Sequence, residues 1–252
     1  MMKFIPFVLL LVTANLIADD TPRHFLYLGP EVTHLKRTRE GGISQSGETL
    51  GVRGGYEYLK RYKFYWGVEG NYYSGTLKGH AGKDDKIKSH FSDWSLEGRF
   101  GYTFAQKCGW RISLTPYFGY GAGVERNNFI NPSPLHIHTH LDYHYIPVGL
   151  IAYARLNGYW DVGLNFKAKF LFESRNEVSN DPEFDKTKML VKESIHYRLE
   201  IPIIYKAYPQ WYVGLVPFYE YRHFDRQPNF PFDFLETKLY MYGASIQLIY
   251  CL

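Results

Sequence analysis

The chain has 252 residues, a formal net charge of +4 and an aromatic content of 18%, with 23 tyrosines and 18 phenylalanines. The small charge forms no clustered basic stripe, which argues against nucleic acid as a partner. After the N-terminus no apolar run approaches the ~18 residues of a transmembrane helix, so a helical membrane protein is excluded. Membrane-spanning strands are not excluded, because alternating apolar and polar residues average to a low hydropathy.

The N-terminal segment "MMKFIPFVLLLVTANLIADD" has the composition of an export signal. Lys3 gives it a charged start, an apolar run follows over residues 4–12, and the small residue Ala18 precedes two aspartates. We therefore predict a signal peptide at residues 1–18 and a single mature domain at residues 19–252. Cys108 and Cys251 are the only cysteines, too few for a disulfide scaffold in a domain of this length.

Segments with a strict period of two recur along the mature chain. In "DWSLEGRFGYTF" one face is apolar and largely aromatic, whereas Asp93, Glu97 and Arg99 share the other face. In the sixth such segment the apolar phase changes around Pro147, which predicts a one-residue bulge near Ile146. The pattern predicts ten strands, near residues 24–38, 48–59, 64–75, 91–104, 110–126, 140–155, 159–174, 190–206, 211–225 and 236–250.

The connections between these strands alternate in length. Those after the even-numbered strands are short, such as "KRYK", whereas those after the odd-numbered strands are long and polar, such as "TLKGHAGKDDKIKSH". This asymmetry is typical of a closed up-and-down barrel in an outer membrane, with tight periplasmic turns and long external loops. The chain is therefore predicted to be all-β, a ten-stranded antiparallel transmembrane β-barrel with five long external loops.

The aromatic and charged residues fit the two faces of such a barrel. Trp110, Trp160 and Trp211 each open a strand after a short turn, as expected for an aromatic girdle at a membrane interface. The other strand face carries charges of both signs, so we expect a lumen largely plugged by ion pairs rather than a wide pore. The predicted lumen charges are Arg53, Glu57, Glu69, Asp93, Glu97, Arg99, Arg111, Glu125, Lys167, Arg198, Glu200, Glu220 and Arg222.

The final segment, "LYMYGASIQLIYCL", is similar to the last-strand signal of the bacterial outer-membrane β-barrel superfamily. Gly243 is followed by Ile246, Leu248 and Tyr250 on one face, although the chain then ends on two further residues, neither of them aromatic. The resemblance covers the whole mature chain by pattern. It implies location in the bacterial outer membrane, contact with outer-membrane lipid and recognition by the barrel-insertion machinery.

A first set of candidate catalytic residues follows from a comparison with the omptin proteases. These ten-stranded barrels use paired acids on one external loop and an Asp/His pair on another. Here Asp84 and Asp85 lie on the second long loop, and His223 and Asp225 lie near the external end of the ninth strand. The His/Asp pair comes one loop too late, and the fourth long loop has no histidine to activate water.

A second candidate set is the histidine-rich segment "LHIHTHLDYH". His136, His138 and His140 share one face of an extended chain, a spacing that can bind Zn²⁺ or Cu²⁺ or sense mild acid. The alternative is a polar external segment whose histidines face water or the lumen. No cofactor is expected.

The function expected from this architecture is that of a non-enzymatic outer-membrane surface protein. Its external loops would serve envelope structure, adhesion or contact with host or envelope proteins, above a plugged lumen. Two alternatives stay open, a narrow channel for ions or small solutes and an omptin-like outer-membrane enzyme. A soluble secreted β protein is a further alternative.

Overall fold

The computed structural model describes residues 23–60, 62–82, 85–107, 111–134, 136–182, 186–191, 194–229 and 233–252. The predicted signal peptide lies outside these residues, as do Asp84, Cys108 and Trp110, and the side chain of Arg111 is not described. Within the described ranges no helix is long and apolar enough to cross a membrane.

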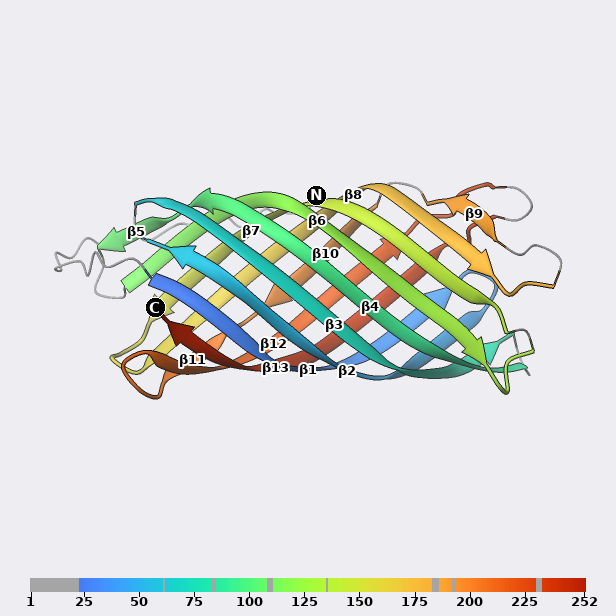
Figure 1. Cartoon of the computed structure of the whole chain (residues 1–252), viewed down its shortest axis with the longest axis horizontal. Helices are drawn as coiled ribbons and strands as arrows, with labels where there is room; N and C mark the ends of the chain where they lie inside the picture. The colour runs from blue at the N-terminus through green and yellow to red at the C-terminus, as the bar shows by residue number, and fades with distance from the viewer. Residues whose placement is uncertain are drawn as a thin grey trace, which may run out of the picture.

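The described residues form one closed antiparallel sheet whose strands wind around a long axis (Figure 1). β1 closes the barrel by pairing with β13 on one side and β2 on the other. The strands are β1 (Arg23–Arg39), β2 (Ile43–Leu59), β3 (Phe64–Ala81), β4 (Asp85–Tyr102), β5 (Phe104–Lys107), β6 (Arg111–Ile130), β7 (His138–Arg155), β8 (Trp160–Ser179), β9 (Thr187–Leu190), β10 (Ile195–Glu200), β11 (Ile203–Lys206), β12 (Trp211–Phe224) and β13 (Thr237–Cys251).

These segments occupy ten positions around the barrel. β5 continues β4 in the same register along β6, with a break only at Thr103. β9, β10 and β11 likewise continue one another in a single register along β8. Pro202 accounts for the break between β10 and β11, because proline has no N–H to donate to the ladder. The predicted ten-stranded up-and-down barrel is confirmed.

The end of the barrel that holds the C-terminus, β5 and β11 has the short turns, and we call it the periplasmic end (Figure 1). At the opposite, external end the strands run further than predicted. The segment expected to form the second long loop is mostly ladder, because Thr76–Ala81 pairs with Asp85–His90. Above the membrane the outward face becomes polar, whereas inward side chains such as Leu77 and Phe91 are apolar and buried. The apolar residues therefore change to the opposite phase, and the pattern that marks the lower part of each strand ends there.

The external connections are correspondingly shorter than the sequence indicated. Only residues 40–42 join β1 to β2, and Gly41 and Gly42 have φ angles of 86° and 78°, a region that favours glycine. The connection between β12 and β13, residues 225–236, is the longest at this end. Its residues Gln227 and Phe234 form an isolated bridge that folds the segment back on itself.

A register shift occurs near the predicted bulge, but on the neighbouring strand. β7 keeps one phase throughout, and Tyr143, Tyr145 and Pro147 all point into the barrel. The shift lies between the pairings of His144 and Tyr145 with β8, where Phe172 is the extra residue. The prediction of a bulge in β7 is therefore wrong. At its external end β7 has apolar inward residues such as Tyr143 and Tyr145, which fill the lumen, whereas further along it has apolar outward residues such as Val148 and Leu150, which face lipid. In the sequence this switch of the apolar face looks like a change of phase.

The outward face of the barrel is a belt of exposed apolar side chains. Trp94 and Leu96 are 44% and 54% exposed, whereas Asp93, Glu97 and Arg99 on the other face are buried. Exposed leucine, isoleucine, valine or phenylalanine side chains occur at all ten barrel positions. A water-soluble protein rarely exposes a contiguous apolar surface of this extent, so the belt is the surface that meets lipid.

Candidate functional site

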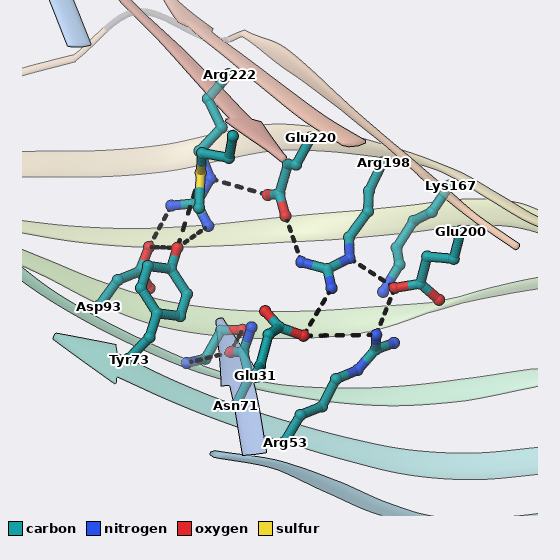
Figure 2. A network of polar contacts seen from close by, with 12 residues as sticks. Glu31, Arg53, Asn71, Tyr73, Asp93, Lys167, Arg198, Glu200, Glu220 and Arg222 are labelled. Carbon is teal, nitrogen blue, oxygen red and sulfur yellow. Dashed lines mark hydrogen bonds and ion pairs between the residues drawn. The ribbon is translucent and has the colours of Figure 1, made fainter. Parts of the chain in front are cut away.

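The lumen holds one continuous network of buried charges. Eight carboxylates and seven cations are linked by ion pairs, and their side chains are only 0–12% exposed. Figure 2 shows the middle of the network, where side chains from several strands meet. Charges this deeply buried persist only when they are paired. The members are Glu31, Arg37, Arg53, Glu57, Glu69, Asp93, Glu97, Arg99, Glu125, Lys167, Lys169, Arg198, Glu200, Glu220 and Arg222.

Glu69 on β3 is the centre of the periplasmic half of this network. Its Oε2 lies 2.5 Å from an Arg53 nitrogen, and its Oε1 lies 2.5 Å from Arg99 and 3.3 Å from Lys167 Nζ. The hydroxyl of Tyr27 also donates to it at 2.8 Å. One carboxylate therefore joins side chains from β1, β2, β4 and β8.

Arg222 on β12 is the corresponding centre of the external half. Its guanidinium pairs with Asp93 and Glu220, donates to the Tyr73 hydroxyl at 2.8 Å and lies 3.7 Å from Glu125. The Tyr73 hydroxyl in turn donates to Asp93 at 2.9 Å. The side chain of Arg222 is 1% exposed, so water supplies no substitute for these partners.

External to the charges, the lumen is filled by an apolar plug. Tyr143 joins the two layers, because its ring packs in the plug while its hydroxyl donates to Asp93 at 3.1 Å. Met189 and Phe234 come from β9 and from the β12–β13 connection, so segments at the mouth help to close it. The buried members of the plug are Leu35, Tyr73, Leu77, Phe91, Leu141, Tyr143, Tyr145, Leu171, Val178, Met189, Val191, Phe224, Phe234, Leu239 and Met241.

On the periplasmic side of the charges the lumen keeps a pocket of about 110 Å³. Its lining combines apolar side chains such as Phe25, Tyr153 and Ile249 with network members such as Arg53 and Glu57. The volume suits a few water molecules, at ~30 Å³ each, and the charges bound it towards the outside. The pocket is thus a vestibule that ends at the network.

Every predicted lumen charge whose side chain is described belongs to this network. Lys169, on the same face of β8 as Lys167, also belongs to it. Glu31 and Arg37, both on β1, were missed in the sequence analysis. Val32 marks the outward phase of that strand, but His34 and Lys36 also point outward and obscure the alternation. Glu31 and Arg37 are each an odd number of residues from Val32, and this spacing would have indicated that both point into the lumen.

Two of the three predicted girdle tryptophans can be placed. Trp160 and Trp211 lie at the periplasmic end of the outward face, 42% and 43% exposed. Each packs against a tyrosine of a neighbouring strand, with ring centroids 4.9 Å apart for Tyr205 and 4.7 Å for Tyr250. An indole with one side in lipid and its N–H near water is typical of a membrane interface.

The last strand has the faces that the superfamily resemblance implies. Ile246 and Leu248 are 58% and 53% exposed on the outward face, and Tyr250 follows on the same face. Gly243 lies on the inward face, in register with Thr33 of β1. Cys251 carries a free thiol at the end of the strand. Recognition of this strand by the insertion machinery stays a prediction.

The candidate catalytic residues do not converge. Asp85 begins β4, His223 lies near the end of β12, and four barrel positions separate these strands in either direction. His223 points outward, between two buried neighbours. It stacks on Tyr221, and its Nε2 lies 2.8 Å from Glu236 and 3.4 Å from Asp225. Asp85 and His223 thus lie on opposite walls.

The acids around His223 form a local rim cluster. In the part of the chain that the structure describes, His223, Asp225 and Glu236 are the one group whose ligand atoms lie close enough for a metal ion. Lys238 Nζ, however, lies 2.8 Å from the Glu236 carboxylate. Hydrogen bonds from Lys238 and His223 lower the pKa of Glu236, so this carboxylate already has cationic partners.

We expect the folded barrel not to hydrolyse peptides with paired basic residues. The reason is geometric, because Asp85 and His223 lie on opposite walls and the His223 side chain points outward. The measurement is cleavage of a fluorogenic diarginine peptide by the native protein and by Asp85→Ala and His223→Ala variants. Cleavage by the native protein that either substitution abolishes would contradict this expectation.

The three histidines predicted to bind a metal in the β6–β7 region do not form a common site. His136 Nε2 lies 2.9 Å from Asn131 Oδ1, and His140 Nε2 lies 3.0 Å from Asp142 Oδ1. Among the described residues, no metal-ligand group includes His136, His138 or His140. The ring nitrogens of His136 and His140 thus contact two different protein oxygens rather than a common point.

Solved structures with a similar fold were found by comparison. The outer membrane protease OmpT from Escherichia coli matches with a TM-score of 0.58 and 12% identity, over 96% of this chain and 100% of that one. The translocator domain of the autotransporter NalP from Neisseria meningitidis matches with a TM-score of 0.51 and 8% identity, over 92% and 90%. No protein-family model and no curated protein matches the sequence. At these identities the likeness shows the fold alone.

The closed barrel and its apolar belt define the class of protein. Only helices and closed barrels satisfy their backbone groups within a bilayer, and this chain forms a closed barrel with lipid-facing side chains on every strand position. The protein is a transmembrane β-barrel with the fold of the bacterial outer-membrane barrels.

Proposed function

We propose that the protein is a non-conducting surface barrel of the outer membrane. Its external end contacts other molecules, and neither ions nor solutes pass through its lumen. The observation that supports this most directly is the pair of seals in series, the charge network and the apolar plug. An ion crossing the lumen would have to displace charges that are already paired with one another. The extended strands above the belt supply a rigid external surface for contact, adhesion or envelope structure.

The test is conductance in planar bilayers. We expect no discrete current steps from the purified, folded barrel at either polarity in concentrated salt, because both seals must open for a continuous water path. A general porin added to the same bilayer serves as the positive control. Reproducible steps that scale with the amount of inserted barrel would overturn the proposal and favour the narrow-channel alternative.

A further inference from the structure

The outer wall above the apolar belt carries three lysines in one register row that crosses four strands. The register joins Lys36 of β1 to Ser46 of β2, Ser46 to Lys78 of β3, and Lys78 to Lys88 of β4. All four side chains lie on the outward face, because their neighbours along each strand point into the barrel. Lys78 and Lys88 are directly opposite each other, a like-charge arrangement that destabilises a sheet.

The next row towards the outside repeats this composition. Ser44 of β2 pairs with His80 of β3, and His80 pairs with Lys86 of β4. Two adjacent rows thus hold lysines, a histidine and serines, with no acid among them. Without a compensating anion this arrangement would only repel itself, and such repulsion in a folded protein commonly marks a binding surface for anions.

Acids of the described part of the chain do not pair with these rows. Among the described residues, none forms an ion pair with Lys36, Lys78, Lys86 or Lys88, whereas Glu48 on the same wall pairs with a histidine. The opposite wall is different, because its exposed charges are mixed and paired. Examples there are Glu173 with Arg175 at 3.0 Å and Glu177 with Lys188 at 3.8 Å.

The rows border a surface cavity of about 530 Å³. Lys78, Lys86 and Lys88 line it together with serine hydroxyls, and no carboxylate is among its lining residues. Pro132 of the β6–β7 connection forms another part of the lining. Ser133 fixes that connection, because its hydroxyl accepts from the Lys88 N–H and donates to the Lys88 carbonyl, each at 2.8 Å. The cavity is therefore built from ordered elements.

The cavity lies above the lipid headgroups. Lys78 and Lys88 are six residues beyond Tyr72 and Trp94, the last exposed aromatic residues of the belt on β3 and β4. At ~3.3 Å per residue and a tilt of ~40°, this separation is about 15 Å along the membrane normal. The headgroup layer is only ~5–8 Å thick on each side, so a ligand must arrive from beyond it.

We propose that this cavity binds a saccharide bearing several sulfate or phosphate groups, presented from outside the cell. Lysine ammonium groups are compact charges suited to such anions, and serine hydroxyls suit the hydroxyl groups of a sugar. Neighbouring strands lie ~4.8 Å apart, so Lys78 and Lys88 on adjacent strands can each contact an anionic group of an extended polyanion. The inference rests on the proposed function, because it gives the external surface a class of partner.

The test uses the full barrel in nanodiscs of phosphatidylcholine and a fluorescent sulfated hexasaccharide, with binding measured by fluorescence polarisation at low salt. We expect binding that weakens by about ten-fold in the Lys78→Ser/Lys88→Ser variant, the loss of roughly one charge-assisted hydrogen bond at an exposed site. Lys188→Ser removes a paired lysine from the opposite wall and should change nothing. Both changes are on the outward surface, so the barrel should stay folded, which its circular dichroism would verify.

Three results would overturn the inference. These are no binding of the sulfated probe, equal binding by the Lys78→Ser/Lys88→Ser variant, and loss of binding in nanodiscs of phosphatidylglycerol, which would assign the lysines to lipid headgroups. The unsulfated hexasaccharide should not bind. Conductance of the same preparations keeps the two proposals apart, because a non-conducting barrel without probe binding contradicts only the site, and a conducting barrel with probe binding contradicts only the proposed function.

Discussion

Replacing Arg222 by methionine should lower the free energy of unfolding by about 3–5 kcal/mol, the range for a buried ion pair that loses one partner. Methionine keeps much of the bulk of the side chain but none of its donors. Asp93 would retain hydroxyl donors such as Tyr73, whereas Glu220 and Glu125 would each lose a cation in a lumen that water does not enter freely. The loss of stability arises because these carboxylates stay buried away from water while one of their cationic partners is missing.

Urea unfolding of the barrel in detergent micelles, followed by tryptophan fluorescence, would measure this loss. Arg175→Met is the matched control, because Arg175 pairs with Glu173 at 3.0 Å while both side chains are more than half exposed. Exposed pairs contribute only about 0–1 kcal/mol. An effect of Arg222→Met no larger than that of Arg175→Met would contradict the view that the network is a buried electrostatic unit.

The faces of the barrel strands were predictable because the membrane imposes a simple rule on them. Within the belt the outward residues must be apolar and the inward ones can be charged. The sequence alone therefore predicts that Trp94 faces lipid and Glu97 faces the lumen, as the structure has them. Above the belt this rule lapses. Lys78 and Lys88 point outward, whereas their strand neighbours Leu77 and Ile87 are buried, so the apolar phase is the reverse of that within the belt.

The contacts of the lumen could not be predicted in the same way. Pairs two residues apart on one strand, such as Glu97 with Arg99 at 2.6 Å, follow directly from spacing. The contact of Lys167 Nζ with Glu97 at 2.8 Å joins β8 to β4, which are not neighbours in the sheet. Such contacts depend on the stagger of many strands around the barrel, which sequence patterns leave undetermined.

The candidate catalytic residues show the same limit. Their positions at strand ends correctly located Asp85 and His223 at the external end of the barrel. Which wall each occupies depends on the strand order, and which way His223 points depends on its phase within β12. To predict a site one needs the end of the barrel, the wall and the direction of each side chain, and the sequence indicated clearly only the end of the barrel.

Gly123→Ala should destabilise the barrel by about 1–3 kcal/mol, although it adds a single methyl group, because overpacking a filled interior costs this much. A Cβ at Gly123 would lie 2.5 Å from the Tyr143 ring and hydroxyl oxygen and 2.9 Å from the Trp94 carbonyl oxygen. Tyr143 has little room to move, since it is buried and its hydroxyl donates to Asp93. The clash therefore disturbs the junction between the apolar plug and the charge network.

A double-mutant cycle isolates this clash. In a Tyr143→Ala background most of the effect of Gly123→Ala should vanish, giving a coupling energy of about 1–2 kcal/mol in the same urea experiment. Gly98→Ala on the neighbouring strand is the control, because its nearest contact is the Tyr120 carbonyl oxygen at 4.0 Å, and it should leave stability unchanged or slightly raised. Equal effects of Gly123→Ala with and without Tyr143 would show that this glycine does not make room for the tyrosine, and that the tyrosine ring is not held where the plug requires it.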